Sequence, residues 1–73
     1  MDIDNSDILN VVSDNLRIAR LKQRISQEKL AEMVDISTKY LNMIENRKAN
    51  PTIVIVIKIC KALNLGLETV YQV

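Results

Sequence analysis

The chain has 73 residues, 48% of them hydrophobic, with one cysteine, no histidine and a net charge of +1. This length allows a single small domain, and the lone cysteine excludes an internal disulfide. The lack of histidine argues against a structural zinc site, and no charge-free apolar run reaches the ~20 residues that a membrane-spanning helix needs.

The first element follows an acidic start. Residues 1–6 are expected to be a flexible N-terminus, and residues 7–73 to form the domain. Residues 1–4 lack the basic region of a signal peptide, so a cytoplasmic protein is expected. Ser6 or Asp7 can cap a first helix that ends near residue 23. Its apolar positions recur at helical spacing: Ile8, Val12, Leu16 and Ala19.

The charge is divided unevenly along the chain. Residues 1–14 hold four aspartates and no basic residue, whereas residues 15–73 hold all ten Lys and Arg against five acidic residues. A basic body of this kind is compatible with a surface that faces nucleic acid. Ordinary solvated charges would give the same pattern, so the charge distribution alone does not establish a surface that binds nucleic acid.

Residues 26–50 form the most informative stretch. Ser26 can cap a second helix over residues 27–34, Asp35 and Ile36 can form a tight turn, and Ser37 can cap a third helix over residues 38–45. The inward side chains of the two helices are expected to be Leu30, Ala31, Val34, Leu41 and Ile44. Two short helices joined in this way, with a polar start to the second, are typical of a helix-turn-helix.

A fourth helix is expected to carry Pro51 in its first turn. Residues 52–59 are β-branched and would favour a strand by propensity alone, but their apolar positions also fit a helical stripe. That stripe consists of Ile53, Val56, Ile57, Cys60 and Leu63, which leaves Val54 and Ile55 facing outward. Asn64 is expected to end this helix, and Gly66 to open a short last helix over residues 67–72.

Residues from about 12 to 71 resemble the Cro/repressor-type, or Xre-like, helix-turn-helix family. The matching residues are Leu16, Arg17, Arg20, the run 26–32, Ile36, Ser37, Ile44, Glu45, Asn46, Lys48, Pro51 and the run 62–65. The resemblance implies an all-α, five-helix, lambda-repressor-like fold in which the second and third helices form the DNA-binding unit. The chain departs from the family at four positions where glycine is usual: Arg24, Asp35, Arg47 and Asn64.

The resemblance also implies where DNA would be contacted. The residues expected at base edges are Ser37, Thr38, Lys39, Asn42 and Met43. Lysine can donate to guanine, asparagine can pair with adenine, and threonine or methionine can pack on a thymine methyl. The residues expected at phosphates are Ser26, Gln27, Tyr40, Asn46, Arg47 and Lys48. Four of these have an alternative: Tyr40 could cover the junction of the two helices, Ser26 could be a plain N-cap, and Arg47 and Lys48 could belong to a solvated loop.

Two further expectations come from the family. Arg20 and Glu45 should form an ion pair that joins the first helix to the end of the third. Family members commonly dimerise, and Val54, Ile55 and Tyr71 are the candidates for that contact. Scattered surface apolar residues would be the simpler explanation of these three side chains.

The sequence therefore predicts a sequence-specific regulator of transcription that binds double-stranded DNA, a repressor that reads a two-fold operator as a homodimer. A toxin or another regulator could be a protein partner. The alternative is an antitoxin-like or adaptor module that keeps the fold with little or no DNA binding. No enzyme is expected, because the chain lacks histidine, a phosphate-binding glycine loop and clustered carboxylates. No cofactor, metal or small-molecule ligand is expected either.

Overall fold

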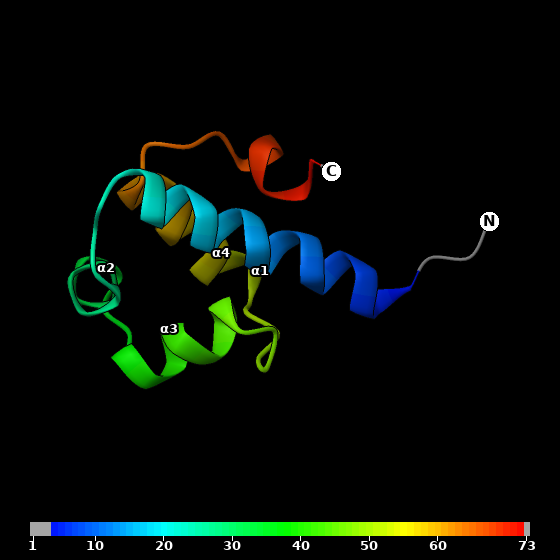
Figure 1. Ribbon diagram of the computed structural model, residues 1–73, viewed down its shortest axis with the longest axis horizontal. Coiled ribbons are helices and arrows are strands. Elements are labelled where there is room, and N and C mark those ends of the chain that lie inside the picture. The colour runs from blue at the N-terminus through cyan, green and yellow to red at the C-terminus, as the bar shows by residue number, and fades with distance from the viewer. Residues whose placement is uncertain (1–3, 73) are drawn as a thin grey trace.

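The computed structural model describes residues 4–72, and the regular elements among these residues are all helices, joined by turns and loops. The chain forms α1 (Asn5–Lys22), α2 (Gln27–Val34), α3 (Thr38–Glu45), α4 (Ile53–Ala62) and a 3₁₀ helix, η1 (Leu67–Tyr71). In Figure 1, α1 runs along the molecule with α2 and α3 below it and η1 above it. The predicted all-α helix-turn-helix class is confirmed, with the difference that the fifth element is a 3₁₀ helix. Residues 1–3 of the expected flexible N-terminus lie outside the described residues.

Side-chain caps begin the two central helices where the sequence predicts them. The Ser26 hydroxyl accepts a hydrogen bond from the backbone N–H of Lys29 at 3.0 Å. The Ser37 hydroxyl accepts one from the N–H of Tyr40, also at 3.0 Å. Each bond satisfies one of the N–H groups that a helix start leaves without an intrahelical partner. The bounds of α2 and α3 consequently match the prediction.

The starts of α1 and α4 differ from the prediction. Asp4, and not Ser6 or Asp7, caps α1, and its carboxylate also suits the positive end of the helix dipole. Thr52 caps α4, and its hydroxyl accepts from a backbone N–H at 3.2 Å. Pro51 therefore precedes the cap and lies outside the first turn, because threonine can accept this bond and proline cannot.

The four α-helices end in the same way. The residues just beyond their last turns, Arg24, Asp35, Arg47 and Asn64, all have positive φ, between 57° and 64°. After each of them the next N–H reaches back five residues to a carbonyl, as Ile36 does to Ala31 at 3.0 Å and Leu65 does to Cys60 at 2.8 Å. This is the Schellman arrangement, in which glycine is the usual left-handed residue.

The hydrophobic core draws on all five helices. Its buried apolar side chains are Leu16, Leu30, Ala31, Val34, Leu41, Ile44, Val56, Ile59, Cys60, Leu63 and Val70. Cys60 is a core residue, as expected, and its burial raises the pKa of the thiol. Asn15 ties η1 to α1, because its amide donates to the carbonyls of Val70 at 2.8 Å and Gln72 at 2.9 Å.

The predicted inward stripe of α4 was wrong in part. Ile53 is 60% exposed and Ile57 is 37% exposed, whereas Ile59 is fully buried. Ile55, expected to face outward, is half-buried and packs against the core. Residues 53–57 are all Ile or Val, so this run offered no polar position to fix the rotation of the helix. In α1, Ile8 is likewise exposed instead of inward-facing.

Among the helices of residues 4–72, none has both the length and the apolar character required to span a lipid bilayer.

Candidate nucleic-acid interface

The outward face of α3 is polar and exposed. Ser37, Thr38, Lys39 and Asn42 are exposed, and Met43 is half-buried. Leu41 and Ile44 hold the opposite face in the core. In Figure 1, α3 lies along the lower edge of the molecule, with the other elements above it. The five residues expected at base edges therefore lie at the start of α3 and along the side that faces away from Leu41 and Ile44.

A buried ion pair fixes the C-terminal end of α3. The guanidinium of Arg20 donates to both carboxylate oxygens of Glu45, with Nε–Oε2 at 2.8 Å and Nη2–Oε1 at 2.9 Å. The remaining terminal nitrogen of Arg20 donates to the carbonyl of Ile25 at 2.7 Å. Planar pairing of this kind sets both distance and orientation. The sequence expects this pair, and the structure places it between α1 and α3.

The ion pair continues as a chain of hydrogen bonds to the outward face of α3. Gln27, the first residue of α2, donates from Nε2 to Oε1 of Glu45 at 3.0 Å. Its own carbonyl oxygen accepts from Nδ2 of Asn42 at 3.2 Å. The Asn42 amide keeps a second N–H and its oxygen, which are the groups that a bidentate contact to adenine needs. A polar side chain on the exposed face is thus tied to the buried interior.

Most of the residues expected at phosphates lie at two places, the start of α2 and the loop that follows α3. Ser26 and Gln27 lie at the N-terminus of α2, where free N–H groups and the helix dipole favour an anion. Asn46 follows α3 and donates from its side chain to the carbonyl of Asn42 at 2.8 Å. Lys48 is exposed in the loop that follows. Tyr40 is half-buried and packs against the core, as its alternative role at the helix junction requires.

Arg47 makes a contact that sequence reasoning missed. Its guanidinium pairs with the Asp14 carboxylate of α1, with Nε–Oδ1 at 3.1 Å and Nη2–Oδ2 at 2.5 Å. The hydrogen bond from Arg47 is the main reason that the pKa of Asp14 lies below its ordinary value, and Arg17 adds to the effect. The same bond raises the pKa of Arg47. No local signal links two positions 33 residues apart, so only the fold reveals the pair.

Comparison with known proteins matches this architecture. The model of the HTH_3 helix-turn-helix family matches residues 16–70. Control protein C.SmaI of Serratia marcescens is 35% identical over 66 residues, which cover 90% of this chain and 79% of that protein.

Two solved structures have a similar fold. The restriction-modification controller protein C.AhdI from Aeromonas hydrophila has a TM-score of 0.82 and 25% identity, covering 86% of this chain and 96% of its own. The hypothetical transcription factor NHTF from Neisseria has a TM-score of 0.85 at 22% identity, covering 99% of this chain and 84% of its own, and shows the fold alone. The family match spans more than half of the chain, and the chain therefore belongs to the HTH_3 helix-turn-helix family of Cro/repressor-type, Xre-like proteins.

Proposed function

We propose that this protein regulates transcription by binding a two-fold double-stranded DNA operator as a homodimer, with α3 in the major groove. The observation that carries the proposal is the hydrogen-bonded chain from Arg20 through Glu45 and Gln27 to Asn42. It holds an exposed polar face in one orientation before any DNA is bound. Preorganisation of this kind lowers the ordering cost of binding.

The side chains of α3 have divided roles in this proposal. Lys39 donates to guanine, Asn42 pairs with adenine, and Thr38 packs on a thymine methyl. Ser37 and Met43 complete the contact with the bases. Each good bidentate contact supplies ~1–3 kcal/mol of discrimination between bases.

The phosphate contacts set position and affinity. Gln27 and Ser26 meet a phosphate at the start of α2, while Asn46, Arg47 and Lys48 meet the backbone beyond the end of α3. Tyr40 completes the set through its hydroxyl. These contacts hold the protein in register but carry no sequence information of their own.

The relatives named as control and restriction-modification controller proteins favour a target among the genes of a restriction–modification system. Occlusion of the operator would make the protein a repressor there. The competing function is a module that binds a protein partner, such as a toxin or another regulator, and has lost DNA binding. The exposed polar face of α3 favours DNA.

Selection from random duplex DNA, followed by titration of the recovered site over a range of salt concentrations, tests the proposal. A symmetric site with half-sites about 10 bp apart is expected, with a slope of log K against log salt of about −0.9 per phosphate contact. Asn42→Ala should relax the preference at one position of each half-site. Lys22→Ala, on the exposed end of α1 away from α3, is the matched surface control. No consensus and no salt dependence would support the interaction module instead.

A further inference from the structure

The hydrogen-bonded chain that ends at Asn42 begins at a group that only accepts. Glu45 is 2% exposed, and both of its carboxylate oxygens accept from the guanidinium of Arg20. A carboxylate in such a pair has no proton to donate. Any further polar group that approaches Glu45 must therefore be a donor.

This requirement fixes the orientation of the Gln27 amide. Its nitrogen lies 3.0 Å from Oε1 of Glu45. If the amide were turned over, its oxygen would face the carboxylate, and two acceptors would meet without a hydrogen between them. The nitrogen of Gln27 therefore faces Glu45, and its oxygen is left to accept from α3.

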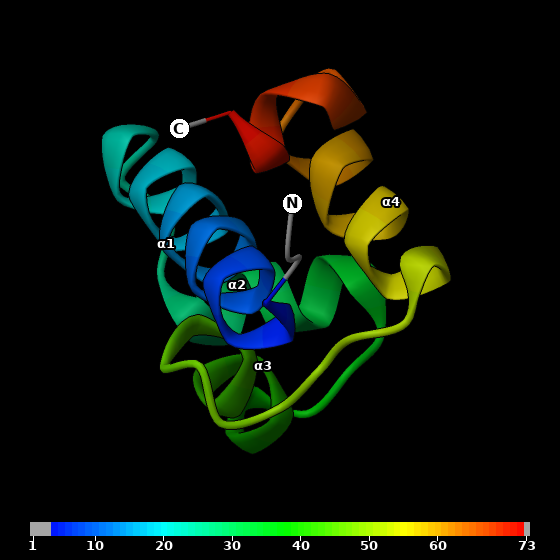
Figure 2. The ribbon, with the colours of Figure 1, turned by 90° about the vertical axis from the view of Figure 1, so that its right-hand side faces the viewer.

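The orientation of Gln27 fixes that of Asn42 in turn. The Gln27 oxygen lies 3.2 Å from Nδ2 of Asn42, an exposed residue of α3. Asn42 must supply the donor here, which leaves its oxygen and its second N–H for another molecule. In Figure 1 and in Figure 2, α3 lies below α1. The chain of hydrogen bonds thus leads from the contact between these two helices to the outward side of α3.

The orientation of this amide matters because its donor and its acceptor are not equivalent. Adenine presents an acceptor, N7, beside a donor, N6, whereas guanine presents two acceptors, N7 and O6. An asparagine amide in one orientation matches adenine, and turning the amide over exchanges its donor and its acceptor. An amide that is free to turn must be ordered when DNA binds, which lowers affinity by about twofold to tenfold per side chain.

We propose that Glu45 and Gln27 are positioning residues that determine which base Asn42 prefers, although the buried Glu45 touches no DNA. The carboxylate orients the Gln27 amide, and Gln27 orients the Asn42 amide before DNA is bound. Gln27 thereby contributes to sequence preference in addition to its phosphate contact. This inference rests on the proposed function, for which it names the residues that set the preference at one base pair.

Discrimination at one base pair separates a positioning role from a phosphate contact. The base pair read by Asn42 is the one at which Asn42→Ala relaxes the preference. Fluorescence anisotropy gives the Kd for the selected operator and for a duplex in which the adenine of that pair is replaced. Gln27→Met keeps the length of the side chain and loses both hydrogen bonds, so it should reduce the ratio of the two Kd values by about twofold to tenfold per half-site. Loss of a phosphate contact alone would raise both Kd values equally and leave their ratio unchanged.

Two controls test whether Gln27 acts through Asn42. In an Asn42→Ala background, Gln27→Met should leave the ratio unchanged, because no amide remains to be positioned. Gln23→Met removes a glutamine hydrogen bond elsewhere, from Nε2 to the backbone carbonyl just after α4 at 2.6 Å, and should keep the wild-type ratio. Dimerisation should be the same in all variants, because the exposed dimer candidates Val54 and Tyr71 lie on α4 and η1.

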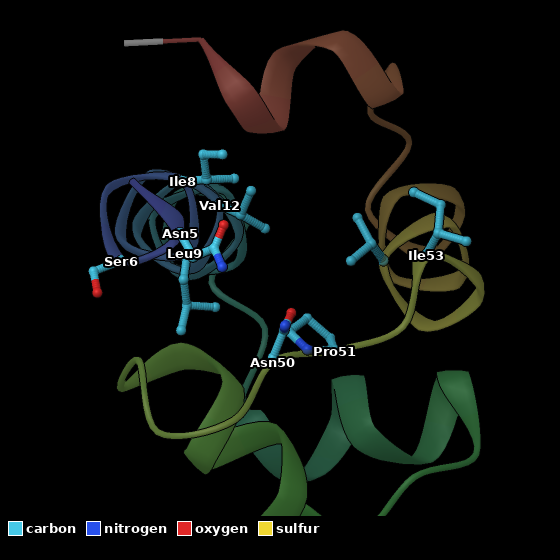
Figure 3. A pocket seen from close by; sticks show the side chains of 9 residues that line it. Asn5, Ser6, Ile8, Leu9, Val12, Asn50, Pro51 and Ile53 are labelled. Carbon is cyan, nitrogen blue, oxygen red and sulfur yellow. The ribbon is translucent and has the colours of Figure 1, made fainter. Parts of the chain in front are cut away.

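The orientation of the amide is also measurable without DNA. NMR relaxation of the free protein gives an order parameter for each side-chain amide. The Asn42 amide should be more ordered than that of Asn50, an exposed residue beside Pro51 in the groove between α1 and α4 (Figure 3). In Gln27→Met the order parameter of Asn42 should fall to that of Asn50. Circular dichroism checks that the variant is folded, and Gln27→Ala is a second variant with the same expected result.

The outcomes separate this inference from the DNA-binding proposal. In the wild-type protein, an Asn42 amide as mobile as that of Asn50 would overturn the positioning role. A ratio of Kd values that Gln27→Met leaves unchanged at a specific operator would also overturn it, while the proposed function stands. If Gln27 orders the Asn42 amide but no duplex is bound specifically, the proposed function fails, and the role in base preference fails with it.

Discussion

Arg20 and Glu45 form an ion pair with two hydrogen bonds. The pair is almost completely buried, because only 8% of the surface of Arg20 and 2% of that of Glu45 is exposed. They join the first helix to the last residue of α3 across 25 positions of sequence. Since Glu45 also accepts from Gln27, the same carboxylate supports the start of α2. One buried group therefore sets the relative positions of three helices.

Glu45→Ala should destabilise the fold before it affects recognition. Removing one partner leaves the Arg20 charge buried and unpaired, which costs roughly 3–5 kcal/mol. Urea unfolding followed by circular dichroism measures this free energy. Glu28→Ala, which removes an exposed carboxylate on α2, should change this free energy by less than about 0.5 kcal/mol. Thermal unfolding of Glu45→Ala close to that of the wild type would refute the supporting role of the pair.

Asp14→Asn should strengthen DNA binding. In the free protein the Arg47 guanidinium is engaged by Asp14, and the neutral amide would release it for a phosphate. We expect higher affinity and a slope of log K against log salt that is steeper by about 1. Fluorescence anisotropy with the selected operator measures both quantities.

The control for this effect is the same substitution in a chain that lacks the arginine. If Asp14 acts through Arg47, Asp14→Asn should bring no gain in an Arg47→Ala background. An equal gain in both backgrounds would mean that Asp14 acts by its charge alone, and that the pair does not compete with DNA.

The Asp14–Arg47 pair should also make the free energy of unfolding depend on pH in the acidic range. The folded-state pKa of Asp14 lies below the ordinary value of 3.8, so the unfolded chain takes up the proton first as the pH falls. The contribution of the pair is therefore complete above pH 3.8 and is lost as the pH falls through the folded-state pKa. The difference in unfolding free energy between wild type and Asp14→Asn should be constant near neutral pH and shrink below 3.8. A difference that stays constant as the pH falls through and below 3.8 would contradict the assignment.

The central helices were predictable from sequence because their signals are local. Ser26 and Ser37 cap the helices three residues before the N–H groups that they bind, and both caps are where the sequence places them. The rotation of α4 was not predictable, because Ile53 and Ile57 are chemically equivalent to the buried Ile59. Only the position of neighbouring helices decides which of them is covered.

Of the two ion pairs between distant positions, one was predictable and the other was not. The Arg20–Glu45 pair was expected from the family resemblance and from nothing in its spacing, whereas Asp14 had no such guide and was missed. The assignment of residues to bases and phosphates stays a prediction, because these contacts are made with a second molecule and not within the fold.

The four departures from glycine give the last prediction. Arg24 has φ of 57° in the turn after α1, a conformation that costs a residue with a Cβ about 1–2 kcal/mol. Arg24→Gly should therefore be more stable than Arg24→Ala by about 1 kcal/mol, although glycine loses more entropy on folding. Comparing these two variants cancels the loss of the arginine charge, and urea midpoints measure the difference. The stability difference between Asn64→Gly and Asn64→Asp should be smaller, because aspartate, like asparagine, tolerates the left-handed region better than alanine does. Equal stability of Arg24→Gly and Arg24→Ala would show that this turn carries no strain in the folded chain.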